Sequence, residues 1–76
     1  MEISDFIKKV ASQFDEIDVN LFTSKTHFKN IDEWSSLIAL SVIAMIDEEY
    51  NVAIKGNDIR NASTIEDLFN IVKSLK

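Results

Sequence analysis

The sequence predicts a small all-α domain, a four-helix bundle with one long loop between its first and second helices. Three observations indicate this fold class. Apolar residues near both ends of the chain recur every three or four positions, which is the spacing of one helix face. No segment alternates apolar and polar residues as a half-buried strand would. The 76 residues include no proline and one glycine, so few positions would interrupt a helix.

A first amphipathic helix is predicted from near Ile3 to near Ile17. The apolar residues of this segment recur at intervals of three and four, which places them on one side of the helix. We expect this side to face the core. Its members are Ile3, Phe6, Ile7, Val10, Phe14 and Ile17.

A long loop is predicted between Ile17 and Trp34, because this segment shows neither helical nor alternating periodicity. Structureless connections longer than about a dozen residues are unusual in compact domains and tend to be functional. Ordering such a loop costs conformational entropy, which apolar anchoring must offset. We therefore expect substantial burial of Phe28, Ile31 and Trp34. The full set of expected anchors is Val19, Leu21, Phe22, Phe28, Ile31 and Trp34.

The second predicted helix covers residues 37–50 and is apolar nearly all round. This is expected of a central helix that the other helices contact. We expect Asn51 to end it. Gly56 then suits a turn, and a short helix is predicted over residues 58–61 with Ile59 as its inward residue.

The last predicted helix begins after Ser63, which is expected to form a capping box with Glu66. Such a box satisfies backbone N–H groups that the first helical turn leaves without acceptors. A buried stripe is expected along this helix. Its members are Ile65, Leu68, Phe69, Val72 and Leu75.

Length and composition limit the classes of function. The chain fits one domain over residues 1–76, and it has no cysteine, one histidine and one glycine. This excludes disulfides, thiolate zinc sites, cysteine nucleophiles, two-histidine metal sites and glycine-rich phosphate loops. The longest apolar stretch, residues 37–46, is well short of the ~20 residues that cross a bilayer. We expect a cytoplasmic monomer that does not insert into membranes.

The charge is acidic and unevenly spread. Thirteen acids and eight bases give a net charge of −5, which argues against nucleic acid as a partner. Between residues 30 and 54 the chain has five acids and no lysine or arginine. An acidic patch steers a small domain toward basic partner surfaces, although an acidic face can equally serve solubility alone.

Residues suited to catalysis or metal binding are sparse. His27 has the chemistry of a general base, but its expected place in the loop gives it no partner of known position. The acidic clusters at residues 15–18 and 47–49 lack the spacing and central glycine of a calcium-binding loop. We expect no autonomous catalysis. A very small hydrolase that uses Ser36 and His27 is the weaker alternative.

The most informative segment is Trp34-Ser35-Ser36-Leu37. Serines before an apolar helix are ordinary N-caps, whose hydroxyls accept hydrogen bonds from first-turn amides. Here they also follow the long loop, open the most apolar helix and lie inside the acid-rich segment. In these features, and in its length, acidity and helix order, nearly the full chain resembles the acyl carrier protein family, including its peptidyl and D-alanyl carriers. The acidic, aromatic-ended run at residues 46–50 extends the resemblance.

The resemblance implies a carrier rather than an enzyme. In the family, the serine of the Ser-Leu pair carries 4′-phosphopantetheine, so Ser36 is the implied attachment site and Ser35 the expected N-cap. The chain would hold acyl or aminoacyl groups as thioesters on this arm, in fatty acid biosynthesis and lipid metabolism or in a specialised acyl or aminoacyl pathway. The implied partners are a phosphopantetheinyl transferase and the enzymes that load and transfer the acyl group. Free amides and the helix dipole would favour a phosphodiester at this position.

Two positions differ from the family's pattern, and both affect the expected partner surface. Ser35 stands where acyl carriers usually have aspartate, and Ile38 stands where fatty-acid carriers usually have an acid. The implied partner-binding residues are Ser35, Leu37, Ile38, Ser41, Met45, Glu48 and Ile54. Helical spacing places four of these, from Ile38 to Glu48, on one stripe. The same spacing fits Ile38 and Met45 as core residues instead.

A second class of function fits the same residues. A small acidic helical interaction module without a prosthetic group would use the Glu48 end of the stripe to dock a basic or apolar partner. Modification of Ser36 by a transferase distinguishes the two classes.

Overall fold

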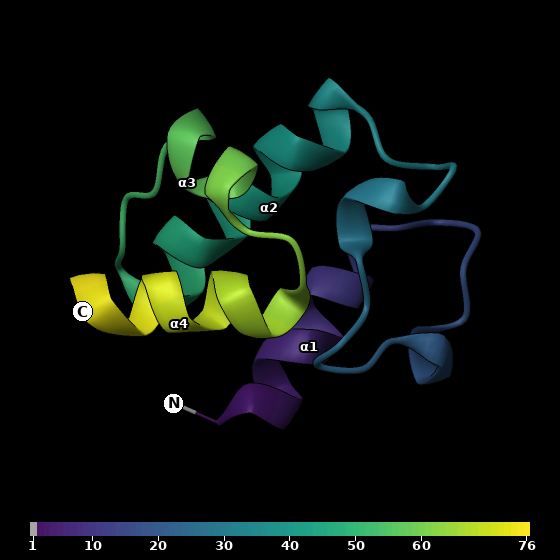
Figure 1. Ribbon diagram of the computed structural model, residues 1–76, viewed down its shortest axis with the longest axis horizontal. Coiled ribbons are helices and arrows are strands. Elements are labelled where there is room, and N and C mark those ends of the chain that lie inside the picture. Colours follow the sequence, from purple (N-terminus) through teal and green to yellow (C-terminus); the bar gives the residue numbers. More distant parts are fainter. Residues whose placement is uncertain (1) are drawn as a thin grey trace.

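The computed structural model describes residues 2–76 and contains four α-helices and no strand in that range (Figure 1). Two short 3-10 helices lie within the loop that joins the first two α-helices. The elements in chain order are α1 (Ile3–Ala11), η1 (Val19–Leu21), η2 (Phe28–Asn30), α2 (Ser36–Tyr50), α3 (Gly56–Asn61) and α4 (Ile65–Leu75). The predicted small all-helical fold with a long first loop is confirmed.

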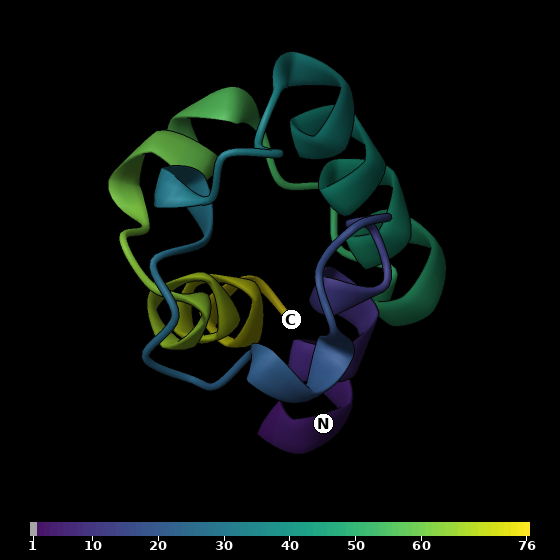
Figure 2. The same cartoon turned by 90° about the vertical axis from the view of Figure 1, so that its right-hand side faces the viewer.

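The helices and the loop surround one core. α1 packs against both α2 and α4, and α3 packs against α4. Figure 2 shows these elements arranged around a common centre. The largest fully buried side chains come from α1, η2, α2 and α4, and they are Phe6, Val10, Phe28, Val42, Ile46, Ile65, Leu68 and Val72. The loop is therefore part of the core, because η2 contributes one of its largest residues.

α1 ends earlier than predicted, at Ala11 instead of near Ile17. Phe14 is still buried and Ile17 still packs against the core. The prediction that these residues face the core is therefore correct, but the prediction that they are helical is wrong. The physical reason is Glu33, whose carboxylate accepts hydrogen bonds from the backbone N–H groups of Asp15 at 2.6 Å and Glu16 at 3.0 Å. These N–H groups would otherwise bond carbonyls within a longer helix. A tertiary contact has replaced the helix's last turns.

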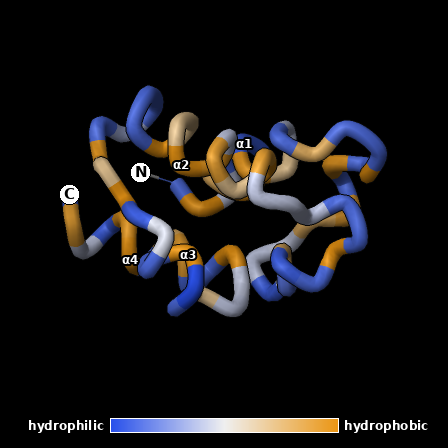
Figure 3. The backbone as a smooth tube through the Cα atoms, turned by 90° about the horizontal axis from the view of Figure 1, so that it is seen from above, coloured by the Kyte–Doolittle hydropathy of each residue, from blue (hydrophilic) through white to orange (hydrophobic). Residues whose placement is uncertain are grey.

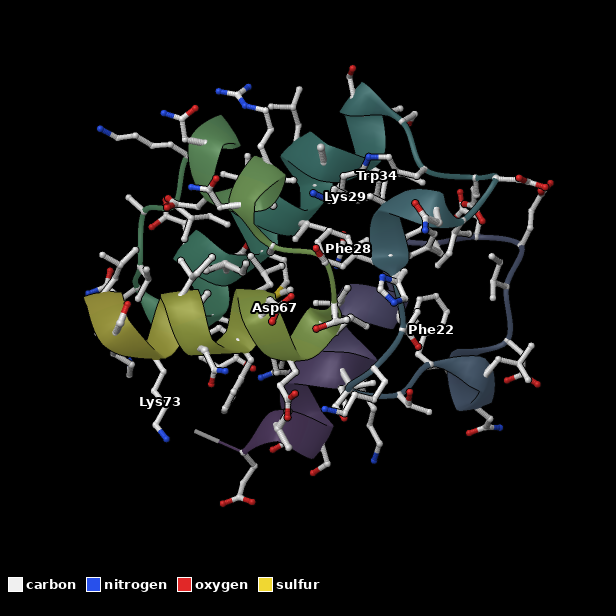
Figure 4. The ribbon with its side chains drawn as sticks, viewed as in Figure 1. Phe22, Phe28, Lys29, Trp34, Asp67 and Lys73 are labelled. Atoms are coloured by element: carbon white, nitrogen blue, oxygen red, sulfur yellow. The ribbon has the colours of Figure 1, made fainter. Side chains whose placement is uncertain are left out.

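Aromatic side chains anchor the loop. Phe28 is fully buried, and the ring of Trp34 lies edge-on to it with centroids 5.3 Å apart (Figure 4). Phe14 contacts both Trp34 and Phe22, at centroid distances of 6.2 and 5.2 Å. Burial of Phe28 is confirmed, whereas Ile31 and Trp34 are half-buried against the core.

The tip of the loop is exposed, contrary to prediction. Val19 and Leu21, both in η1, are exposed and do not act as anchors. In the hydropathy colouring of Figure 3, the loop on the right is a mostly hydrophilic trace with short apolar segments. Phe22, immediately after Leu21, is buried and does act as an anchor.

The loop also binds the first turn of α4. The backbone N–H groups of Ile65 and Glu66 donate to the loop carbonyls of Thr26, at 3.1 Å, and Ser24, at 2.9 Å. The Glu66 carboxylate pairs with Lys25 at 2.7 Å. The first turn of a helix has N–H groups without intrahelical acceptors. These hydrogen bonds therefore pair the free N–H groups of α4 with free carbonyl groups of the loop.

The capping box of α4 lies one residue later than predicted. Thr64, not Ser63, is the N-cap: its hydroxyl accepts a hydrogen bond from the Asp67 N–H at 3.1 Å. The Asp67 carboxylate in turn accepts from the backbone N–H groups of Thr64 and Ser63, both at 3.0 Å. Glu66 is bound to Lys25 instead. The hydrogen bonds from the Thr64 and Ser63 backbone lower the pKa of Asp67 below its ordinary value.

The other helix boundaries follow local signals. Asn51 ends α2 as predicted, in the left-handed conformation with φ 57°. α3 begins at Gly56, two residues before the predicted start, because the Asp58 carboxylate accepts the Lys55 N–H at 2.9 Å and fixes its first turn. Leu75, expected in the buried stripe of α4, is exposed.

Glu33→Ala should lower the free energy of unfolding by about 1 kcal/mol, because two loop N–H groups lose a charged acceptor. Urea unfolding followed by helical circular dichroism measures the change. Asp32→Ala, which removes the neighbouring exposed carboxylate, is the matched control and should have little effect. Equal losses in the two variants would show that Glu33 does not hold the loop.

Asp67→Asn should destabilise the protein at neutral pH in a way that disappears in acid. The pKa of Asp67 is lowered in the folded state, so its ionised form stabilises the fold above the ordinary value of 3.8. That contribution is lost as pH falls through the lowered pKa. The difference in urea midpoint between wild type and variant should therefore close below pH ~4. A difference that persists unchanged at low pH would contradict this, and Asp47→Asn serves as the exposed control.

Candidate functional site

Ser36 is the first residue of α2 and is exposed. The preceding residue, Ser35, is the N-cap, since its hydroxyl accepts a hydrogen bond from the Ile38 N–H at 3.3 Å. The prediction that Ser35 is the N-cap of this helix is therefore confirmed. The Ser36 side chain is exposed, and its hydroxyl has no hydrogen bond to another described residue.

An open groove of about 430 Å³ lies beside Ser36. Its volume is within the range of small-molecule sites. The loop end and η2 form one wall, the start of α2 another and α3 the third. The lining residues are Lys29, Trp34, Ser35, Ser36, Ala39, Ile43, Gly56, Ile59 and Arg60.

The groove combines apolar walls with a basic rim. Trp34, Ile43 and Ile59 supply apolar surface, whereas Lys29 and Arg60 supply positive charge. No aspartate or glutamate is among the lining residues, although the chain carries a net charge of −5. The site is therefore a local basic region in an acidic protein.

The side chains of both bases are held by hydrogen bonds to α3. The Lys29 Nζ donates a hydrogen bond to the backbone carbonyl of Arg60 at 3.0 Å, which links η2 to α3. The Arg60 guanidinium donates to the side-chain oxygen of Asn57. Among residues 2–76 the ion pairs are Lys9–Glu49 and Lys25–Glu66, so neither rim base is neutralised by a carboxylate.

Sequence reasoning missed Lys29 and Arg60. Lys29 immediately precedes the base-free segment from residue 30 to residue 54, whereas Arg60 lies five residues beyond Lys55, the base that follows this segment. Their proximity depends on how the loop folds back onto α3, which no local pattern reveals. The only available signal was the position of Lys29 at the N-terminal edge of that segment.

The exposed face of α2 is rotated from the expected stripe. Ile38 and Met45 are each 8% exposed and belong to the core, and Ile54 is buried as well. Leu37 and Leu40 are instead 73% and 63% exposed. Of the implied partner-binding residues, the structure leaves Ser35, Leu37, Ser41 and Glu48 at least partly accessible.

The accessible face of α2 runs from apolar to acidic. Leu37 and Leu40 lie in its first turns, next to Ser36. Asp47 and Glu48, both exposed, lie in its last turns. Apolar contact is thus available near the groove and negative charge at the far end.

His27 does not line the groove beside Ser36. It precedes η2 and is exposed. Within the described part of the chain, no three histidine, cysteine, aspartate or glutamate side chains form a group that could hold a metal ion. In residues 2–76, every helix is too short or too polar to cross a membrane.

Ile38→Asp should destabilise the protein by at least about 3 kcal/mol, because it buries an unpaired charge. Leu40→Asp changes an exposed side chain of the same helix and should cost within about 1 kcal/mol. Thermal or urea unfolding of both variants measures the difference. Similar losses in the two proteins would mean that this face of α2 is assigned incorrectly.

Comparisons with known proteins identify no relative. No protein-family model matches the chain, and neither a curated protein nor a solved structure matches it. The function must therefore be argued from Ser36, the groove and the accessible face of α2.

Proposed function

We propose that this chain is a carrier domain of the acyl carrier type, which holds a 4′-phosphopantetheine arm on Ser36. The observation that carries the proposal is the combination of an exposed serine at the start of α2 with a groove that has apolar walls and a basic rim. The order of elements supports it further: a long anchored loop, the helix that Ser36 opens, a short α3 and a final α4.

The residues around Ser36 fit the phosphate end of such an arm. A phosphodiester there would lie at the positive end of the α2 dipole, near amides that have no intrahelical acceptor. Lys29 and Arg60 line the same groove and carry the opposite charge. When attached, the group would supply the thiol that this cysteine-free chain lacks.

Ser36 would act as an acceptor and not as a catalytic nucleophile. Serine nucleophiles need a base within hydrogen-bonding reach, and the only histidine is not among the groove residues. Because the hydroxyl is exposed, a separate transferase could reach it and supply the base. The chain would then present acyl or aminoacyl thioesters to partner enzymes, in fatty acid biosynthesis or a related pathway.

The accessible face of α2 suits such partners. Leu37 and Leu40 offer apolar contact close to the arm, where a partner's active site must approach. Asp47 and Glu48 would steer basic partner surfaces from the far end of the helix. The same face also favours the second candidate, an acidic interaction module without a prosthetic group.

Ser36→Ala should abolish modification while leaving the helical circular dichroism nearly unchanged. The test is intact mass after coexpression with a broad-specificity phosphopantetheinyl transferase, followed by mapping of the modified peptide. Ser35→Ala is the matched variant: it should still be modified, but lose roughly 0.5–2 kcal/mol of stability because it removes the cap. Modification at Ser35 would overturn the assignment of the acceptor. A folded wild-type protein that no transferase modifies would favour the interaction module.

A further inference from the structure

The rim of the groove has unused hydrogen-bond donors. The Lys29 ammonium has three donors and the Arg60 guanidinium has five. One donor of Lys29 is taken by the Arg60 carbonyl, and Arg60 bonds Asn57. Both residues line a groove without lining carboxylates. Such a set recognises a phosphate group, whose oxygens accept several charge-assisted hydrogen bonds at once.

The Lys29 side chain is restrained before any ligand arrives. The 3.0 Å bond from Lys29 to the Arg60 carbonyl holds the long lysine side chain across the gap between η2 and α3. Figure 4 places Lys29 beside Trp34, and both line the groove. A side chain that is already restrained loses less conformational entropy on binding.

We propose that Lys29 and Arg60 form an anion site for a phosphate group at the mouth of the groove. This inference rests on the proposed function in one respect: the favoured source of the phosphate is the diester on Ser36, which opens onto the same groove. The two bases hold that phosphate and thereby orient the arm toward α3. A free phosphate-bearing molecule has the same chemistry and is the other source.

A purely structural role for Lys29 makes a different prediction. Its bond to a carbonyl in the last turn of α3 also serves as a helix C-terminal contact. If that were its whole role, removing its charge would change stability and leave phosphate affinity unchanged. Measuring stability and affinity together separates the two.

The test is a titration of the unmodified protein with inorganic phosphate at constant ionic strength. Amide chemical shifts of Ser36 and Gly56 report on the groove. Lys29→Gln and Arg60→Gln should each weaken the fitted affinity about threefold to tenfold, the range of one exposed charge-assisted contact. Lys73→Gln makes the same charge change on the exposed side of α4, away from the groove (Figure 4), and should alter the affinity less than about twofold because of screening.

A second experiment uses the phosphopantetheinylated protein to identify which phosphate occupies the site. If the Ser36 diester occupies the site, added phosphate should no longer shift these amides, and the ³¹P resonance should move in the Lys29→Gln/Arg60→Gln protein but not in Lys73→Gln. If the protein is never modified yet binds phosphate through Lys29 and Arg60, the carrier function fails and the anion site stands, with free phosphate as its ligand.

Two results would overturn the inference. One is the absence of saturable shifts in the unmodified wild-type protein. Another is equal weakening by Lys73→Gln, which would show a general effect of charge. A modified protein that still binds inorganic phosphate as the unmodified one does would leave the carrier function and the anion site intact, but would overturn the Ser36 diester as the ligand of that site.

Discussion

Ordering of the loop between α1 and α2 is the constraint on which the rest of this protein depends. The loop spans roughly a third of the chain, and fixing each residue costs about 1–2 kcal/mol of backbone entropy. Burial of Phe28, the Glu33 carboxylate on two N–H groups and the backbone bonds to α4 offset this cost. Because the loop and η2 carry Trp34 and Lys29, the groove beside α2 exists only while the loop is folded.

The parts of the fold that could be predicted are those with local causes. Asn51 ends α2 because asparagine tolerates the left-handed conformation, and Ser35 caps the same helix through its own hydroxyl. The end of α1 could not be predicted, since the carboxylate that replaces its last turns lies 17 and 18 residues away in sequence. The start of α4 was predicted one residue early, since Ser63 and Thr64 are both capping residues and an acid follows each at the right distance.

The candidate site shows the same division. Ser36 could be singled out because the helix that follows it has a strong local signal. The orientation of that helix could not be determined, since α2 is apolar nearly all round and its spacing fits several faces. Only packing distinguishes Ile38, which enters the core, from Leu37 and Leu40, which do not. The hydrogen bond between the Lys29 ammonium and the Arg60 carbonyl joins residues 31 positions apart, so no local sequence pattern predicts it.

The packing of α1 against α4 has a consequence for synthesis of the protein in the cell. The rings of Phe6 and Phe69 lie edge to face with centroids 5.4 Å apart, so Phe6 is synthesised well before the residue that it packs against. While the ribosome is still extending the chain, Phe6, Val10 and the apolar side of α2 have no α4 to cover them. The nascent protein therefore exposes its future core until α4 emerges, and this domain is expected to fold only once α4 has left the ribosome.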